Sequence, residues 1–216
     1  MNFGSESVSV ESQQSKRPLR EFEAIPSVKM HMLEDFTQNL NEYWGIYMQL
    51  DHDPALTNHL YRVGKRIKNG ELLWTKLDLM DVIRWKRLHP LMKRITQSAP
   101  ELEQRLNEAL TTGDGGDRVE ALCGMQGFGP VLTSAILTLT WPETYGFIGY
   151  HSWTALGALG FDVSGRPFSG GGYTIPEYLR FLMIIQQLAG QVGSSPAQIA
   201  DALYAYDNVR RKSKRT

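Results

Sequence analysis

Apolar residues recur every three or four positions along most of the chain, which is the spacing of one face of an α-helix. The clearest stripe consists of Leu33, Phe36, Leu40, Tyr43, Trp44, Tyr47 and Met48. Proline and glycine mark the ends of further helical segments. We predict these helices over residues 54–70, 77–88, 100–110, 118–123, 131–140, 152–159 and 176–188, and from Ser195 as N-cap through Tyr206. No alternation typical of a strand runs beyond four residues, so the predicted fold class is all-α.

The 216 residues are enough for one large domain. Residues 1–28 begin with a polar, serine-rich stretch that has no apolar core, so we expect a disordered arm rather than a secretory signal. The helical domain should span residues 29–209, with a basic tail at 210–216. A single cysteine, Cys123, excludes a disulfide framework and a four-cysteine cluster. The absence of an 18-residue apolar run predicts no membrane partner, and we expect a cytoplasmic protein.

The net charge of zero hides two basic segments in an otherwise acidic chain. Residues 61–98 carry ten basic and three acidic side chains, and residues 210–216 carry five basic and no acidic ones. Such clustering favours a polyanion as partner, although a solvated helix face and a free tail would give the same pattern.

The segment with the most specific chemistry is Gly127-Phe128-Gly129, followed by Pro130 and the small residues Thr133-Ser134-Ala135. Glycine accepts positive φ angles, so this spacing permits a tight reversal between two helices. Pro130 fits the first position of the second helix, and the next free amides then point outward, where the helix dipole favours an anion. We predict a helix-hairpin-helix element over residues 122–140 that holds a DNA phosphate.

The hairpin stands between other recognisable segments: Trp85-Lys86, Trp153-Thr154-Ala155-Leu156 and Ala202-Leu203-Tyr204-Ala205-Tyr206. Together these residues resemble the helix-hairpin-helix DNA glycosylase superfamily, and in particular small bacterial members without an iron–sulfur cluster. The resemblance covers roughly residues 30–210. It implies a two-lobed helical fold in a monomer that binds double-stranded DNA and flips a base into a pocket between the lobes. The base would be damaged or modified, for example in phage DNA, which would make the protein part of antiviral defence.

Two positions bear on the chemistry that the resemblance implies. Members that also cleave the strand carry a lysine two residues after the second hairpin glycine, and here that residue is Val131. We therefore expect a monofunctional glycosylase, which hydrolyses the N-glycosidic bond and leaves an abasic site. The usual catalytic aspartate corresponds to Gly149, which has no carboxylate.

Three explanations of Gly149 stay open. In the first, the protein binds DNA without catalysis. In the second, another acid, Glu143 or Asp162, replaces the aspartate; in the third, His151 holds the attacking water. A structural role is the more common one for each of these three side chains. A different class of function, a helical protein-interaction domain with a purely structural hairpin, also fits the sequence.

The remaining expectations concern binding. The residues expected to contact DNA are Gln126, Gly127, Phe128, Gly129, Val131, Thr133, Ser134, Lys86 and Arg87. Aromatic side chains stack on any base, so the expected base pocket consists of Tyr43, Trp44, Tyr150 and Trp153, with Tyr47 on the same stripe as the first two. The five histidines have no ligand spacing, and we expect no metal and no cofactor.

Overall fold

The computed structural model describes residues 28–51, 53–113, 115–163 and 172–214. In these ranges the chain is helical and contains no strand, which confirms the all-α class. Residues 1–27 of the expected arm lie outside the described residues, as does 164–171 of the loop expected before the last two helices. Val28 is buried, and the amide of Lys29 donates a hydrogen bond to the Leu159 carbonyl, so these first described residues pack against a distant part of the chain.

The helices of the described residues are, in chain order, α1 (Met30–Gln38), α2 (Leu40–Leu50), α3 (Pro54–Lys68), α4 (Lys76–Trp85), α5 (His89–Met92), α6 (Ala99–Thr111), α7 (Gly115–Cys123), α8 (Pro130–Thr140), α9 (Tyr150–Ala158), α10 (Ile175–Val192) and α11 (Pro196–Ser213). Several start where the sequence places a cap: the Ser195 hydroxyl, for example, accepts a hydrogen bond from the Gln198 amide at 3.2 Å.

The structure differs from the periodicity at one point in particular. The stripe over residues 33–48 is divided between α1 and α2 at Asn39. The Asn39 side chain donates back to the Asp35 carbonyl and carboxylate, each at 3.0 Å, and this local bonding competes with the helical pattern.

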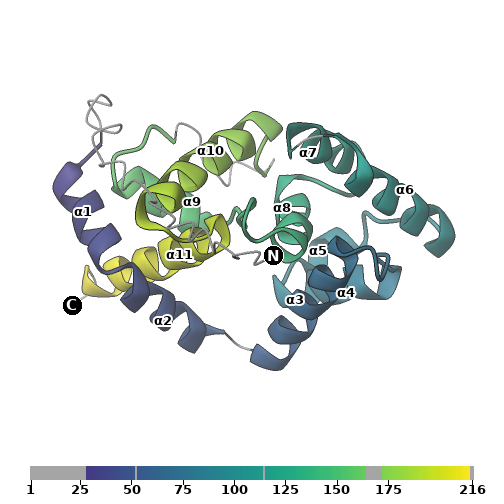
Figure 1. Cartoon of the computed structure of the whole chain (residues 1–216), viewed down its shortest axis with the longest axis horizontal. Coiled ribbons are helices and arrows are strands. Elements are labelled where there is room, and N and C mark those ends of the chain that lie inside the picture. Colours follow the sequence, from purple (N-terminus) through teal and green to yellow (C-terminus); the bar gives the residue numbers. More distant parts are fainter. Residues whose placement is uncertain (1–27, 52, 114, 164–171, 215–216) are drawn as a thin grey trace, which may run out of the picture.

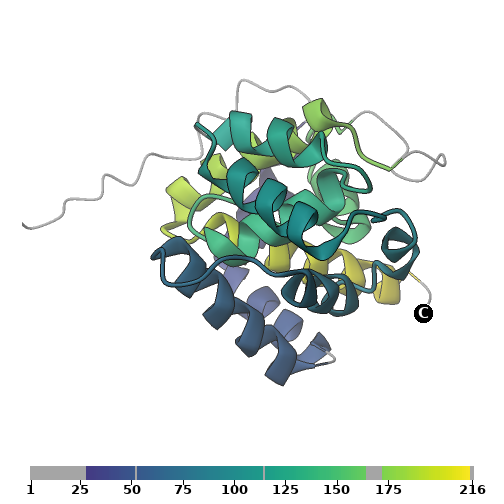
Figure 2. The ribbon, with the colours of Figure 1, turned by 90° about the vertical axis from the view of Figure 1, so that its right-hand side faces the viewer.

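The helices form two groups that are visible in Figure 1. One group holds α2, α9, α10 and α11, in which α11 packs against the other three. The second group holds α3, α4, α6, α7 and α8, in which α3 packs on both α4 and α8. Contacts of α10 with α7 and α8 join the groups, and the chain passes between them at the short α2–α3 connection (Figures 1 and 2).

One glycine fixes the packing of α3 on α8. A Cβ atom on Gly64 would lie 2.1 Å from the Leu139 carbonyl oxygen, so the two helix backbones meet without a side chain between them. Beside this contact the buried Trp74 donates its indole N–H to the Thr140 hydroxyl at 3.3 Å. The C-terminal end of α8, the helix that follows the glycine hairpin, is thereby anchored to the rest of its group.

Candidate functional site

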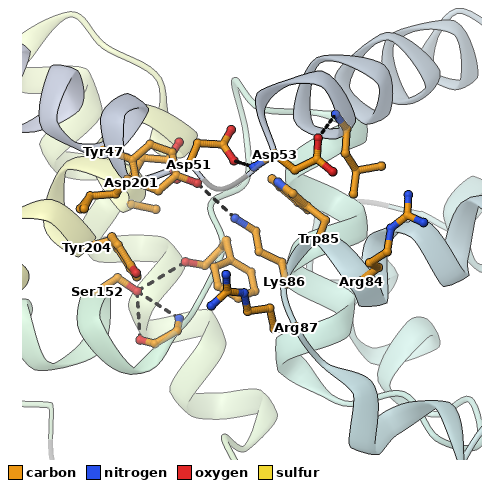
Figure 3. Close-up of a pocket in the computed structure, with 15 residues that line it drawn as sticks. Tyr47, Asp51, Asp53, Arg84, Trp85, Lys86, Arg87, Ser152, Asp201 and Tyr204 are labelled. Atoms are coloured by element: carbon orange, nitrogen blue, oxygen red, sulfur yellow. Dashed lines mark hydrogen bonds between the residues drawn. The ribbon is translucent and has the colours of Figure 1, made fainter.

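A cavity of about 320 Å³ opens where the two groups of helices meet (Figure 3). Its aromatic walls are Tyr47 of α2, Trp85 of α4, Phe147 of the α8–α9 connection and Tyr204 of α11. Its charged lining residues are Asp51, Asp53, Arg84, Lys86, Arg87 and Asp201. A cavity of this size with aromatic walls and a few converging polar groups has the character of a small-molecule or nucleobase site.

Lys86 extends from the C-terminal end of α4 across this cavity toward α2 and α11 (Figure 3). Its Nζ atom lies 3.6 Å from the Trp85 ring centre and 4.5 Å from that of Phe147, and it donates a hydrogen bond to the Tyr47 hydroxyl at 3.2 Å. Burial lowers the pKa of Lys86 to about 8, although the charges of Asp201 and Asp51 act in the opposite direction. The amine is therefore easier to deprotonate than an ordinary lysine.

Asp201 of α11 faces Lys86 from the other group of helices (Figure 3). Burial raises the pKa of Asp201 to about 6, and this rise is opposed by the Lys86 charge and by a hydrogen bond with Tyr47. Burial also raises the pKa of the Tyr47 hydroxyl, which therefore stays protonated and donates to the carboxylate. Lys86, Tyr47 and Asp201 thus form a hydrogen-bonded chain that can carry a proton.

Gly149 lies on the wall of the same cavity, at the N-cap of α9. Its amide donates to the Ser152 hydroxyl at 3.0 Å, which closes the start of the helix. A Cβ atom at this position would lie 2.9 Å from the Phe147 ring, so the ring occupies part of the space that a larger side chain would need. The cavity therefore has no carboxylate from this segment, and its acids come from Asp51, Asp53 and Asp201.

None of the acids and bases expected from the sequence lines this cavity, which corrects that expectation. Glu143 forms an ion pair with Lys68, and Asp162 lies 3.1 Å from the Arg180 guanidinium; both carboxylates are more than half exposed. The Nδ1 atom of His151 is 2.8 Å from Asp207, and its ring packs against the outer side of the Tyr204 wall, with ring centres 4.8 Å apart, without lining the cavity itself. Glu143 and Asp162 form ion pairs instead, and the Asp207 carboxylate holds the His151 ring.

Asp207 is the centre of a buried ionic cluster at the C-terminal end of α11. Its carboxylate is fully buried and accepts hydrogen bonds from Arg210 at 2.8 Å and Arg211 at 2.6 Å, besides the contact with His151. Burial raises the pKa of Asp207, but these three hydrogen bonds outweigh it and hold the pKa below its usual value. Arg210 and Arg211 were expected in a free basic tail; they belong to α11 because they satisfy this carboxylate.

The expected base-pocket residues also lie elsewhere. Tyr43 stacks on Phe36, with ring centres 5.8 Å apart, and Trp44 is on the surface. Trp153 is 2% exposed, and the Tyr150 hydroxyl accepts a hydrogen bond from Arg211 at 2.6 Å. Packing in the core holds Tyr43 and Trp153 outside the cavity, the ionic cluster holds Tyr150, and Trp44 lies on the surface.

Three aromatic residues that do line the cavity had a signal in the sequence, and one of them, Trp85, belongs to the Trp85-Lys86 segment of the resemblance. Tyr47 is one helical turn beyond Tyr43 on the predicted stripe, and Tyr204 stands in the segment that carries the resemblance to glycosylases. The signal for Asp201 is weaker: it is the only acid among the apolar residues of α11 from Ile199 to Tyr206.

The glycine hairpin lies beside a second cavity, of about 460 Å³, which is also lined by Lys93 and Arg94. Gly127 has φ +84°, and a Cβ atom there would lie 2.8 Å from the Arg94 carbonyl group, so the turn requires glycine for two reasons. The first helical hydrogen bond of α8 runs from the Thr133 amide to the Gly129 carbonyl. The amides of Val131 and Leu132 precede it, at a helix end that has no side-chain cap.

Other residues of the expected DNA contact set are placed differently. Thr133 and Ser134 are fully buried, and the Ser134 hydroxyl donates to the Val131 carbonyl and accepts from the Ile148 amide. The Ser134 hydroxyl thus stabilises the α8–α9 connection, and the Thr133 hydroxyl accepts a hydrogen bond from the Cys123 thiol of α7 at 3.4 Å. Neither hydroxyl is open to a phosphate, which corrects that expectation. Phe128 is buried at the turn and Gln126 receives a hydrogen bond on its carbonyl from Gln97, so both support the hairpin.

Arg87 is an exposed cation at the rim of the first cavity, and it has an unusual backbone. Its φ is +56°, the left-handed region that non-glycine residues rarely adopt. The Leu88 amide donates to the Ile83 carbonyl at 2.8 Å and the Arg87 amide to the Arg84 carbonyl at 3.1 Å. This is a Schellman ending of α4 with arginine at the position that glycine usually occupies.

No protein-family model, curated protein or solved structure matches this chain. Among the described residues, no helix is long and apolar enough to cross a membrane.

Proposed function

We propose that this protein binds DNA through the start of α8 and admits a flipped base to the cavity between the two groups of helices, where it hydrolyses the N-glycosidic bond. The observation that carries the proposal is the convergence of Gly149, Lys86 and Asp201 on one aromatic cavity. The first two belong to segments on which the resemblance to DNA glycosylases rests, and Asp201 provides there the carboxylate that position 149 lacks. The division of the described helices into two groups supports the proposal, because the resemblance implies two lobes.

The hairpin supports the DNA-binding part of the proposal. Two free amides at a helix N-terminus, with Lys93 and Arg94 around the same hollow, suit a phosphate group. Such contacts position the strand without reading its sequence. Arg87 at the rim of the first cavity is placed to meet a second phosphate.

The first cavity supports the catalytic part. The rings of Tyr47, Trp85, Phe147 and Tyr204 offer faces on which a base can stack. When the bond between C1′ and the base breaks, its electron pair leaves with the base and positive charge develops on the sugar. The Asp201 carboxylate stabilises that charge and accepts a proton from the water that attacks C1′.

The experiment is a comparison of the natural protein with Asp201→Asn on duplexes that carry a panel of modified bases. Alkali then converts each abasic site to a strand break, which a labelled strand reports. We expect alkali-labile sites with the natural protein, a loss of at least about a hundredfold in Asp201→Asn, and no loss in the control Asp162→Asn, whose carboxylate is exposed and outside the cavity.

Other outcomes favour the alternative functions. Tight binding without alkali-labile sites on any duplex would favour a non-catalytic DNA-binding module. The observation that favours this alternative is Gly149, which has no carboxylate where the resemblance implies the catalytic aspartate. Absence of binding at low salt would exclude both DNA functions and leave a protein-interaction domain. If binding occurs, affinity should fall by about one power of the salt concentration for each phosphate contact.

A further inference from the structure

Lys86 is not needed for hydrolysis by Asp201, yet it occupies the middle of the cavity (Figure 3). Among the described residues it forms no direct ion pair: the hydrogen bond of its Nζ atom goes to the Tyr47 hydroxyl, and aromatic rings cover the atom on two other sides. A lysine whose role were to hold a phosphate would be expected at the protein surface with its charge hydrated. The enclosure of this amine favours a reactive role.

We propose that Lys86 is a nucleophile that forms an imine with the open-chain aldehyde of 2-deoxyribose, the sugar left after a base has been removed. For DNA as the source of that sugar, the inference rests on the proposed function. Val131 led us to expect an enzyme without an imine-forming lysine, because Val131 occupies the usual lysine position in the hairpin helix. The inference changes that expectation, because the lysine at the end of α4 enters the cavity instead.

The step balances without an external reagent. The ammonium of Lys86 first passes one proton to Asp201 through the Tyr47 hydroxyl, which bridges the two groups. The neutral amine attacks C1′ of the aldehyde, and the C–N bond forms as the carbonyl π bond opens onto its oxygen. That oxygen takes up two protons, one from the amine nitrogen and one returned by Asp201, and leaves as water. An iminium bond then links the sugar to Lys86.

The protonation state of Lys86 suits this step. With a pKa of about 8, roughly one amine in ten is neutral at pH 7, about 300-fold more than for a lysine at the ordinary value of 10.5. The charged and titratable groups around the amine act in both directions; they are Tyr47 and Asp51 at the end of α2, Asp53 before α3, Arg84 and Arg87 of the α4 end, and Asp201 and Tyr204 of α11. Imine formation should rise with pH from 6 to 8 and level off above that range.

The test uses two aldehyde probes with the full chain, each with cyanoborohydride, which reduces an imine to a stable secondary amine. One probe is a labelled duplex with a preformed abasic site, so that no base needs to be excised. The other is free 2-deoxyribose 5-phosphate, which needs no DNA binding. Peptide mass spectrometry locates the adduct in both cases.

We expect both probes to label Lys86, and the small aldehyde to label it at least about tenfold faster at pH 7 than the exposed Lys65 of α3. Lys86→Arg keeps a cation in the cavity but forms no imine, so it should lose trapping by at least about tenfold, whereas Lys65→Arg should keep it. Thermal melting of both variants checks that the fold is retained.

The outcomes separate this inference from the proposed function. If neither probe labels Lys86, or if Lys86→Arg is trapped as well as the natural chain, the inference is overturned. If only the free sugar labels Lys86, the nucleophile stands and the DNA-binding proposal fails. If abasic DNA is trapped at Lys86 but no modified base is ever excised, the nucleophile again stands and base excision fails.

Discussion

Replacing Arg87 by glycine should make the protein more stable and a weaker DNA binder. Arg87 has φ +56° at the end of α4, where the two hydrogen bonds of a Schellman ending fix its backbone. The left-handed conformation costs a residue with a Cβ atom about 1–2 kcal/mol. Glycine avoids this cost, but its greater freedom in the unfolded chain removes about 0.4–1 kcal/mol of the gain.

The net increase in the free energy of unfolding should therefore be about 0.5–1 kcal/mol for Arg87→Gly. For a domain of this size that corresponds to a rise of about 2 °C in Tm. Urea denaturation measures the free energy, and it should be run beside Arg87→Ala, which removes the guanidinium but keeps the Cβ atom. The glycine variant should be more stable than the alanine variant by about 1 kcal/mol.

The same pair of variants tests the binding role of this residue. Both remove the cation at the cavity rim, so both should weaken DNA binding equally and lower the salt dependence by about one phosphate contact. Equal stability of the glycine and alanine variants would refute the strain argument. Unchanged binding in both would show that Arg87 meets no phosphate.

Three further predictions concern packing, charge and pH. Gly64→Ala should lower the free energy of unfolding by at least about 2 kcal/mol, because its Cβ atom would overlap the Leu139 carbonyl. The control Gly45→Ala in α2, where the space is open, should raise the free energy of unfolding by about 0.5–1 kcal/mol. Equal effects of the two substitutions in urea denaturation would contradict the α3–α8 contact. Asp207→Asn should lower the free energy of unfolding by about 3 kcal/mol near neutral pH. Since folding lowers the pKa of this carboxyl, the difference in stability between the natural protein and the variant should shrink as pH falls below about 4. A difference that persists in acid would exclude the ionic cluster as its cause. Base excision should decline about tenfold per pH unit below about pH 6, where Asp201 becomes protonated, and a pH–rate profile that is flat from 5 to 7 would exclude this carboxylate as the base.

The helices of this fold could be predicted because their signals are local. Apolar spacing and caps such as Ser195 depend on neighbours within a few positions, and the structure agrees with them. The division of the first stripe at Asn39 was missed, because a side chain that bonds back to Asp35 outweighs a continuous apolar pattern.

The site could be predicted only where the residues concerned belong to recognisable segments. Lys86 and Gly149 were singled out from such segments, and both line the cavity. Asp201 was missed, because its importance depends on which face of α11 packs on α2 and borders the cavity. His151 was assigned to the wrong place for a similar reason: its partner, Asp207, is 56 residues away along the chain.

The contact between Gly64 and the Leu139 carbonyl has a consequence for the spacing between two points at which a DNA strand would be held. α3 begins beside the first cavity at Asp53, and α8 begins at the hairpin, so the backbone contact between these helices fixes the distance from one to the other. Under the proposed function, the protein then keeps a constant spacing between the phosphate at the hairpin and the base in the cavity. A phosphate held at the hairpin determines which nucleotide along the strand is presented to the cavity, and the choice of position is made by length before any base is examined.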